Sequence, residues 1–321
     1  MGALVEGRWT EEDHLQDATG RFVRVVSSFR AAIGDALFPP QAGRYHLYVV
    51  KNCPWAHRTW IFRALKGLQT AIPLHFAAGG PEGWIIDPAG AHLVPGTERR
   101  IRHLHELYSL ADPGFSGRVT VPVLWDSERK TIVNNESSEI IRMFNGGFGD
   151  LATRPGDFYP EALRPEIESV NQRVYEDINN GVYRAGFATT QAAYDEAVDR
   201  VFAALDWAEE RLSRQRYLCG SRLTEADWRL FPTLLRFDLV YYSHFKCNLR
   251  RLADYPNLSN YLRELHQWPG VAETCDLAVI KQGYYTNPTM LKLNPTGIVP
   301  KGPLLDYTGA HDRARFPAVA V

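Results

Sequence analysis

The sequence predicts an α/β domain followed by an all-α domain. A strand-like run at residues 45–50, a helix-like run from 54 to about 66 and a second strand-like run at 74–77 form a β-α-β unit, which favours two parallel strands. From residue 161 onward, apolar residues recur at helical spacing instead. The Gly- and Pro-containing stretch 149–160 between these regions is typical of a linker. We therefore expect a domain boundary there.

Residues 1–44 precede the α/β domain, which we place at residues 45–148. The apolar run 22–26 and Phe29 favour an N-terminal arm that docks on the rest of the chain, and a proline pair ends this arm. The segment 79–117 is rich in Gly and Pro, and its length favours a functional lid over a bare connection.

The second half of the α/β domain contains four further expected elements. A helix-like run covers 98–110 within the long segment. Two strands follow at 120–125 and 131–133, joined by a polar turn. A helix beginning at Ser137 completes the domain.

The all-α domain is expected at residues 161–286, with an extended tail at 287–321. Thr224 and Asp227 form an S/T-x-x-D/E capping signature, which supports a helix start at that point. The tail is rich in Pro and Gly, which favours extended chain over helix. The expected helices cover about 161–181, 191–213, 224–241, 256–266 and 270–281.

The composition is that of a cytoplasmic globular enzyme. The chain has 321 residues, of which 45% are hydrophobic and 23% charged, enough for two buried cores. Its formal net charge of -1 gives no field that attracts nucleic acid or an anionic membrane. The four cysteines lack paired spacing, so neither a disulfide framework nor a zinc C-x-x-C pair is expected. The first ten residues are too polar for a signal peptide, and no run approaches the length of a membrane span.

Cys53 is the candidate nucleophile. It lies between a strand-like run and a helix-like run that begins with Pro54, a residue suited to the first helical turn. At a helix N-terminus, the unpaired amides and the positive end of the helix dipole favour thiolate over thiol. The sequence therefore predicts a redox or thiol-transfer site. The other cysteines lie in apolar or helix-like contexts and are expected to be buried and inert: Cys219, Cys247 and Cys275.

Three residues after Cys53 stands Ala56. Dithiol oxidoreductases carry a second cysteine at this position, which attacks the mixed disulfide formed by the first. Here a thiol from outside must resolve that intermediate. Glutathione is the abundant small thiol of a reducing cytosol, so we expect it as co-substrate.

Two further segments suit a bound peptide. Pro122 interrupts a strand-like run, and a cis bond after Val121 would leave the backbone of Val121 able to pair with the ligand. The alternative is a proline on an edge strand. At the next helix N-terminus, the Ser137 hydroxyl and free amides can hold a carboxylate, while Glu136 can pair with an ammonium group. A γ-glutamyl group carries both charges, although simple helix capping explains the same residues.

Other polar clusters show no ligand pattern. His92, His103 and His105, together with nearby arginines, lack metal-ligand spacing and are interpreted as a solvated face. We therefore expect no metal. The glycine pairs at 79–80 and 146–147 lack the G-x-G-x-x-G context, so no nucleotide site is expected.

Nine strings of the chain occur together in one known family. They are Cys53-Pro54-Trp55-Ala56-His57-Arg58, Gly83-Trp84, residues 117–126, Asn134-Asn135-Glu136-Ser137, residues 179–188, residues 224–229, Arg236-Phe237-Asp238, residues 244–248 and residues 294–300. With them the chain resembles the glutathionyl-hydroquinone reductases, the Xi class of the glutathione transferases, from about Phe22 to Pro303.

The resemblance implies a thioredoxin-like N-terminal domain followed by a helical glutathione-transferase C-terminal domain. It further implies that the Cys53 thiolate takes glutathione from a glutathionyl-hydroquinone, and that a second glutathione resolves the mixed disulfide. A homodimer is expected by the same resemblance. The implied site residues are Trp84, Arg118, Val121, Glu136 and Ser137 for glutathione, Tyr183 and Tyr285 for the hydroquinone ring, and Pro122 for the local backbone.

The two tyrosines are expected to reach the site by different routes. Tyr183 lies where Gly181 and Gly186 should interrupt a helix, so its ring can point between the domains. Tyr285 belongs to a segment expected to be extended and able to fold back over Cys53.

One position departs from the family pattern. Gly283 stands where many members have a histidine before a tyrosine pair, so a ring-binding histidine is absent. Two other functions remain open. An omega-like thioltransferase or dehydroascorbate reductase would use the same single thiol. A non-catalytic binding module would not need it, and the intact Cys53 argues against that function.

Overall fold

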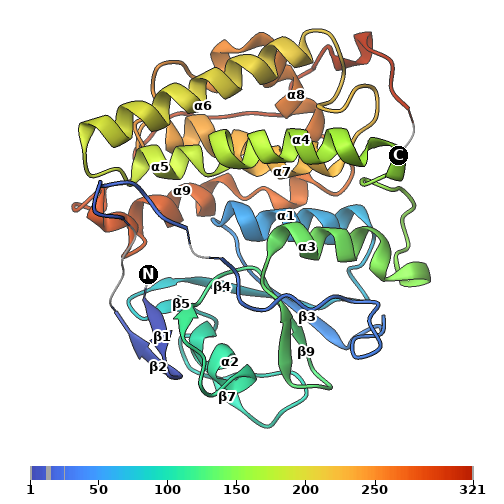
Figure 1. Cartoon of the computed structure of the whole chain (residues 1–321), viewed down its shortest axis with the longest axis vertical. Coiled ribbons are helices and arrows are strands. Elements are labelled where there is room, and N and C mark those ends of the chain that lie inside the picture. Colours follow the sequence, from blue (N-terminus) through green and yellow to red (C-terminus); the bar gives the residue numbers. More distant parts are fainter. Residues whose placement is uncertain (1, 12–15, 25, 320–321) are drawn as a thin grey trace. The chain divides into compact units, whose positions relative to one another are not determined.

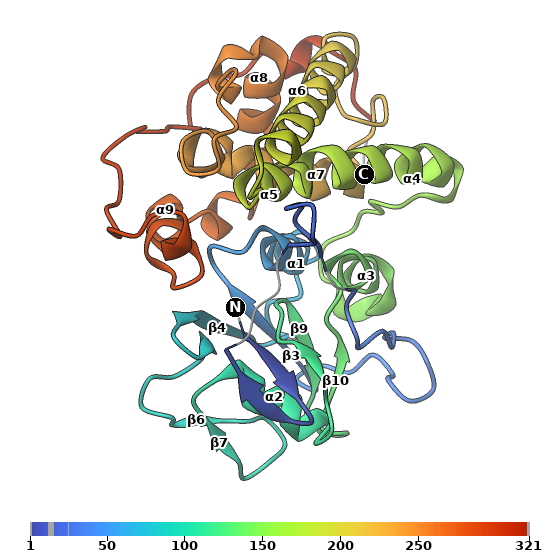
Figure 2. The same ribbon diagram turned by 60° about the vertical axis from the view of Figure 1, so that its left-hand side comes forward.

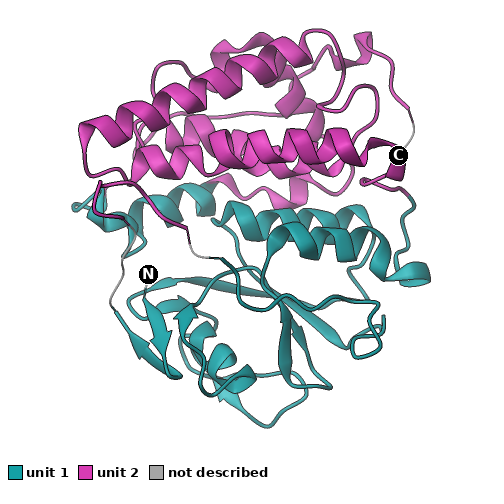
Figure 3. Ribbon diagram, viewed as in Figure 1, with its two compact units in different colours: residues 1–14, 25–155, 278–297 teal, residues 15–24, 156–277, 298–321 magenta. Residues whose placement is uncertain are grey.

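The computed structural model describes residues 2–11, 16–24 and 26–319. They group into two compact units, shown in separate colours in Figure 3. Unit 1 combines Met1–His14, Val25–Pro155 and Ala278–Gly297, and unit 2 combines Leu15–Arg24, Gly156–Leu277 and Ile298–Val321. Residues 278–286 thus group with the α/β unit, whereas the sequence pattern assigns them to the all-α domain. The expected docking of Val25 lies outside the described residues.

Unit 1 is built on a five-stranded sheet with the order β10-β9-β3-β4-β5. Its strands are β3 (Tyr45–Val50), β4 (Leu74–Gly80), β5 (Gly83–Ile85), β9 (Val123–Asp126) and β10 (Thr131–Asn134). The pair β3 and β4 is parallel, which confirms the predicted β-α-β unit, and the other pairs are antiparallel. Helices α1 (Pro54–Leu65) and α3 (Ser137–Arg142) lie side by side on one face of this sheet, and α2 (Leu104–Ala111) lies on the other (Figures 1 and 2).

Two small sheets flank this core. Strands β1 (Ala3–Val5), β2 (Arg8–Thr10) and β8 (Gly117–Arg118) form an antiparallel sheet, and β6 (His92–Leu93) pairs with β7 (Arg100–Ile101). The helix predicted at 98–110 is therefore wrong in its first part. Its residues 100–101 pair as a strand, and the helix begins only after His103, whose side chain accepts the backbone N–H of Glu106.

A buried ion pair fixes the hairpin end of the central sheet. The guanidinium of Arg44 donates to the two carboxylate oxygens of Asp126 at 2.9 and 2.6 Å. The same carboxylate accepts the N–H groups of Glu128 and Arg129 at 2.9 and 3.2 Å, so it also shapes the turn between β9 and β10. Loss of either partner would leave a buried charge unpaired, which is strongly destabilising.

Unit 2 is helical. It contains α4 (Arg164–Arg173), α5 (Gly181–Gly186), α6 (Gln191–Leu212), α7 (Glu225–Arg236) and α8 (Pro256–His266), with π-helical stretches at Val174–Asn179 and Phe237–Tyr241. The Thr224–Asp227 capping box is confirmed. Asp227 is fully buried and also accepts the Leu218 N–H at 2.8 Å and the Tyr261 hydroxyl at 2.7 Å. This one carboxylate therefore ties the start of α7 to α8.

The helix predicted near 270–281 is wrong in its first part and confirmed from Leu277 onward. A short 3-10 turn covers Ala272–Thr274, and α9 runs from Leu277 to Thr286. From the end of α9 to residue 319, where the described chain ends, the backbone is irregular apart from short 3-10 turns at Met290–Lys292 and Arg313–Arg315. Among the described helices, none has the length and apolar character that crossing a membrane requires.

A histidine cluster lies on one face of the β3–β4 pair. His46 Nδ1 and His75 Nε2 are 3.0 Å apart, and the His75 ring stacks on Tyr48 with centroids 4.6 Å apart. The hydroxyl of Tyr48 lies 2.9 Å from His92 Nε2. Burial, followed by the charges of His46 and His92, lowers the pKa of His75 to about 4. His92 is half-buried in this cluster, so it does not belong to a solvated face.

We predict that stability falls in mildly acidic solution because of His75. Its pKa is lowered on folding, so as the pH falls from about 6.5 toward 4 the unfolded chain binds a proton that the folded chain does not. The loss is at most about 1.4 kcal/mol per pH unit. His75→Phe should weaken this pH dependence, measured as urea midpoints at pH 7.5, 6 and 5. Identical pH dependence in the two proteins would contradict the assignment.

Candidate active site

The backbone places Cys53 at the N-terminal end of α1. Cys53 is the N-cap residue in extended conformation, with φ -77° and ψ 120°, and Pro54 begins the helix. Its N–H donates to the Val50 carbonyl and its own carbonyl accepts the His57 N–H, each at 3.0 Å. The end of β3 and the first turn of α1 therefore both fix this residue, and the predicted strand-cysteine-helix junction is confirmed.

The sulfur of Cys53 faces the segment before β9. Its thiol donates to the Val121 carbonyl across 3.9 Å, and the side chain is partly exposed. The Val121–Pro122 bond is cis, as predicted. The structure thus brings Cys53 next to Val121 and the cis bond that follows it, although Cys53 and Val121 are 68 positions apart in the sequence.

The other cysteines have a different environment. Burial raises the pKa of Cys219, Cys247 and Cys275 to about 12 in each case. At neutral pH these thiols stay protonated, and a protonated thiol is a poor nucleophile. Cys219 and Cys247 are buried as expected, whereas Cys275 is partly exposed. The raised pKa values are consistent with the expectation that all three thiols are inert.

Side chains from distant segments support the backbone around Val121. The Tyr108 hydroxyl donates to the Thr120 carbonyl at 2.9 Å and accepts from Asn135 Nδ2 at 3.1 Å. Asn135 Oδ1 in turn accepts the Phe29 N–H at 3.1 Å. Phe29 of the N-terminal arm therefore docks as predicted, and it holds the turn that precedes α3. The roles of Tyr108 and Asn135 have no signal in a single sequence, because their partners lie far along the chain.

Glu136, and not Ser137, caps α3. Its carboxylate accepts the Ser138 N–H at 3.0 Å and the Ser138 hydroxyl at 2.9 Å. The Ser27 hydroxyl donates to its other oxygen at 3.1 Å. Burial alone would raise the pKa of Glu136, but these bonds and the nearby Arg58 charge hold it below its usual value. The predicted carboxylate site at Ser137 therefore has one backbone amide fewer than expected, while a negative charge remains at Glu136.

Trp84 and Arg118 lie on strands at two edges of unit 1. The indole N–H of Trp84 on β5 donates to the Val119 carbonyl at 3.2 Å, two residues before Val121. Arg118 lies on β8 and pairs with Ala3 of β1. A cavity of about 140 Å³ lies beside Trp84 and is also lined by Thr289 and Lys292, which follow α9.

Tyr285 is helical, so the extended segment predicted for it is wrong. It lies in α9 and is buried. Two residues earlier, a Cβ atom at Gly283 would lie 2.5 Å from Asn52 Nδ2. Only glycine allows α9 to approach the residue before Cys53 this closely. Glycine in a helix interior lowers helix propensity, and here the tertiary contact overrides that preference.

The ring of Tyr183 packs within unit 2. Gly181 and Gly186 are the first and last residues of α5, so they bound a helix where the sequence pattern predicts an interruption. Tyr183 is only 8% exposed. Its ring contacts an aromatic cluster and Arg24, whose Cζ atom lies 5.4 Å from the ring centroid. The cluster members are Phe22, Phe187, Tyr241 and Phe245. Phe22 therefore docks as predicted, on residues of unit 2.

His103 and His105 are half-buried, so the interpretation of the 99–105 region as a solvated face is wrong for them. The nearby arginines at 99, 100 and 102 are exposed and do fit that interpretation. Trp9 covers His105, with ring centroids 4.8 Å apart. The sequence offers no local signal for this contact.

Comparison with known proteins agrees with the geometry. The glutathione S-transferase N-terminal domain family matches residues 52–146, and the corresponding C-terminal domain family matches residues 191–264. The chain is 52% identical to the glutathionyl-hydroquinone reductase PcpF of Sphingobium chlorophenolicum, over 96% of this chain and 98% of that protein. It is 46% identical to the glutathionyl-hydroquinone reductase YqjG of Escherichia coli, over 98% of both.

Solved structures give the same result. The glutathione-bound structure of YqjG superposes with a TM-score of 0.85 at 45% identity, covering 98% of this chain and 100% of that one. A Xi-class glutathione transferase from Natrialba magadii superposes with a TM-score of 0.90 at 44% identity, covering 99% and 98%. The fold is thus a thioredoxin-like domain with a helical glutathione-transferase domain. The chain belongs to the Xi-class glutathione transferases, the family of the glutathionyl-hydroquinone reductases.

We predict that alkylation at neutral pH is confined to Cys53. The other three thiols stay protonated because burial raises the pKa of each to about 12. Iodoacetamide at pH 7.5 followed by peptide mass spectrometry should find one adduct, at Cys53, and none in Cys53→Ala. Cys219→Ala serves as the matched control and should keep the adduct. Equal labelling of Cys219, Cys247 or Cys275 in the folded protein would contradict the expected difference in reactivity between these thiols and Cys53.

Proposed function

We propose that this protein reduces S-glutathionyl-hydroquinones to hydroquinones with glutathione as co-substrate. The observation that carries the proposal is the single thiol of Cys53 at the N-terminal end of α1, beside the Val121 carbonyl, with Ala56 at the resolving position. Two relatives at 52% and 46% identity are named glutathionyl-hydroquinone reductases, which supports the choice of substrate.

The proposed reaction has two thiol-transfer steps. The Cys53 thiolate attacks the sulfur of the glutathionyl group, the carbon–sulfur bond breaks, and the ring carbon takes a proton to give the hydroquinone. The protein is left as a Cys53–glutathione mixed disulfide. The thiolate of a second glutathione then attacks this disulfide, which releases oxidised glutathione and the Cys53 thiolate. The ring carbon is reduced and two glutathione sulfurs are oxidised, so the electrons balance.

Residues of unit 1 are proposed to hold glutathione. The backbone of Val121 is proposed to pair with the peptide, because the carbonyl that accepts from the Cys53 thiol loses this donor once the thiolate forms. Glu136, whose pKa is held below its usual value, is proposed to pair with the γ-glutamyl ammonium. The Ser137 hydroxyl, which donates to Glu136 at 3.5 Å in the free protein, is proposed to turn to the ligand's carboxylate. Arg118 lies on β8 and Trp84 on β5. We propose that the Arg118 guanidinium binds a carboxylate of glutathione and that the Trp84 indole packs against its peptide backbone.

Tyr183 and Tyr285 are proposed to bind the hydroquinone ring. Both side chains are largely buried, at 8% and 4% exposure, and a tyrosine supplies a ring for stacking and a hydroxyl for a phenolic oxygen. Support for Tyr285 comes from the contact of Gly283 with Asn52, which holds α9 against the residue before Cys53. We further propose that the protein is a homodimer in the cytoplasm, where reduced glutathione is available.

Cys53→Ala should abolish reduction of glutathionyl-hydroquinone while glutathione still binds, because the binding groups lie on other segments. Limiting substrate should leave one glutathione on Cys53 of the wild-type protein, seen by intact mass. Cys219→Ala is the control and should retain activity. If Cys53→Ala kept more than a few per cent of the activity, Cys53 would not be the nucleophile. The argument against a non-catalytic binding module, which rests on this cysteine, would then also fail.

The omega-like alternative is tested by comparing substrates. Glutathionyl-hydroquinone, dehydroascorbate and chlorodinitrobenzene are assayed side by side with the same preparation. We expect the highest kcat/KM for the glutathionyl-hydroquinone. A higher value for dehydroascorbate would favour a general thioltransferase.

Tyr285→Phe and Tyr183→Phe should each lower kcat/KM for glutathionyl-hydroquinone. The expected decrease corresponds to a loss of about 1 to 3 kcal/mol of transition-state stabilisation, since a polar partner is left unpaired. Reduction of a small glutathione mixed disulfide, which has no phenol, should be nearly unchanged. Tyr194→Phe, whose hydroxyl donates to the Lys246 carbonyl, is the matched control. Equal losses on both substrates would show that the tyrosines support the fold and do not bind the ring.

Light scattering should give twice the chain mass of 36.4 kDa at micromolar concentration. A single mass near that of one chain across this range would reject the homodimer.

A further inference from the structure

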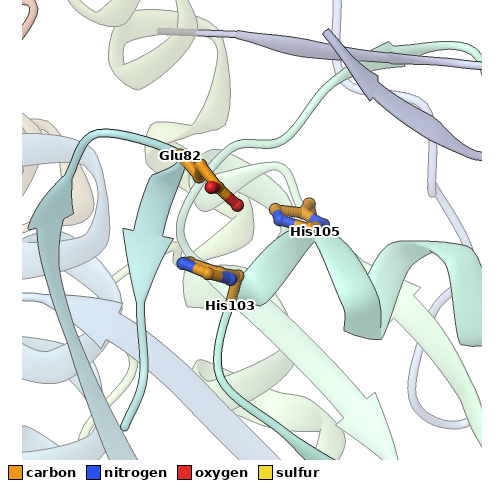
Figure 4. A group of neighbouring side chains, drawn as sticks. All are labelled: Glu82, His103 and His105. Carbon is orange, nitrogen blue, oxygen red and sulfur yellow. The ribbon is translucent and has the colours of Figure 1, made fainter. Parts of the chain in front are cut away.

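Three side chains with metal-ligating atoms meet at the N-terminal end of α2. Glu82 lies in the turn before β5, His103 precedes α2 and His105 lies in its first turn. One ligand atom from each residue lies within 4.8 Å of the other two. Figure 4 shows the Glu82 carboxylate directed toward the two imidazole rings. All three belong to unit 1, and the proposed reaction uses none of them.

Stacking holds the two histidines in place. The His105 ring stacks on Trp9 at 4.8 Å and on His103 at 5.0 Å between centroids. Within the described part of the chain, the buried Nε2 atom of His105 has no hydrogen-bond partner. Buried polar atoms in folded proteins are nearly always bonded, so this nitrogen calls for a ligand.

The spacing of the rings suits one tetrahedral ion. With Zn–N bonds of about 2.0–2.1 Å, two imidazoles on one zinc have ring centres about 5 Å apart. The centroids of His103 and His105 are already 5.0 Å apart, but their planes lie at 11°, nearly parallel. Binding therefore needs the two rings to rotate about their side-chain torsions, out of this stacked arrangement. Glu82 is exposed and can follow.

A second carboxylate stands behind His103. Its Nδ1 atom lies 3.8 Å from Glu106 Oε1, the oxygen that also accepts the backbone N–H of His103 at 2.8 Å. Histidines that bind metals usually donate their other ring N–H to a carboxylate, which fixes the tautomer. Metal on the far nitrogen of His103 would turn Nδ1 into a donor toward Glu106, in place of the capping bond that Nδ1 now accepts.

We propose that Glu82, His103 and His105 form a site for a divalent transition metal ion of the zinc type, with water as a further ligand. Two imidazoles and one carboxylate favour such an ion over magnesium or calcium, which prefer oxygen ligands. The site would join the turn at residues 81–82 to the start of α2. Because Trp84 is the second residue of β5, which follows that turn, the ion would stiffen the strand that carries it.

Zinc titration by calorimetry tests the site on the full-length chain in a Cys53→Ser background, which removes the reactive thiol. We expect one equivalent of zinc, with affinity at least tenfold lower in His105→Gln and in Glu82→Gln. Glu98→Gln, an exposed carboxylate nearby, and His311→Gln, a histidine of unit 2, are matched controls and should bind as the parent does. Should His105→Gln fail to fold, the exposed Glu82→Gln decides the question.

Cobalt absorption adds an independent measurement. Ligation by nitrogen and oxygen gives visible cobalt bands without the strong near-ultraviolet charge transfer of a thiolate ligand. Equal zinc affinity in Glu82→Gln and in the Glu98→Gln control, no binding by the parent, or a thiolate signature would each overturn the proposal.

Discussion

The position of Cys53 is the constraint on which unit 1 depends. Cys53 stands where β3 ends and a helix N-terminus begins, a position that favours the thiolate form of a cysteine. Pro54 starts that helix, and the protonated thiol donates to the Val121 carbonyl. The Tyr108 and Asn135 bonds then hold the Val121 segment and the start of α3 in a common position.

Local sequence was enough to predict the β-α-β unit, because strand and helix periodicities change at Cys53 and the elements follow one another directly. The small sheet of β2, β1 and β8 could not be predicted in this way. Its β1–β8 pair joins Ala3 to Arg118, more than a hundred residues away, and such pairing has no local signal. The Glu6-Gly7 turn, with both residues at positive φ, is the one feature that could have indicated a hairpin.

In the candidate site, too, some residues could be predicted from local sequence and others depend on contacts that only the fold makes. Cys53, Val121 and Pro122 could be predicted because each residue type restricts its own backbone or chemistry. The cap at α3 could not, since Glu136 and Ser137 are both suitable acceptors and only the fold selects the first. The ring of Tyr183 lies among aromatic residues that include Phe22 and Phe245, which are far from it in the sequence, and the half-buried His105 is covered by Trp9. Tertiary neighbours decide such cases.

The division of the chain between the units also has a consequence for protein synthesis. Unit 1 needs residues from the first fourteen positions and from 278–297, with most of unit 2 lying between them in sequence. On the ribosome, the N-terminal part emerges long before α9, so the contact of Gly283 with Asn52 forms only near the end of translation. Until then Asn52, the residue before Cys53, lacks its neighbour from α9, so the last-made part of unit 1 completes the surroundings of one of the first.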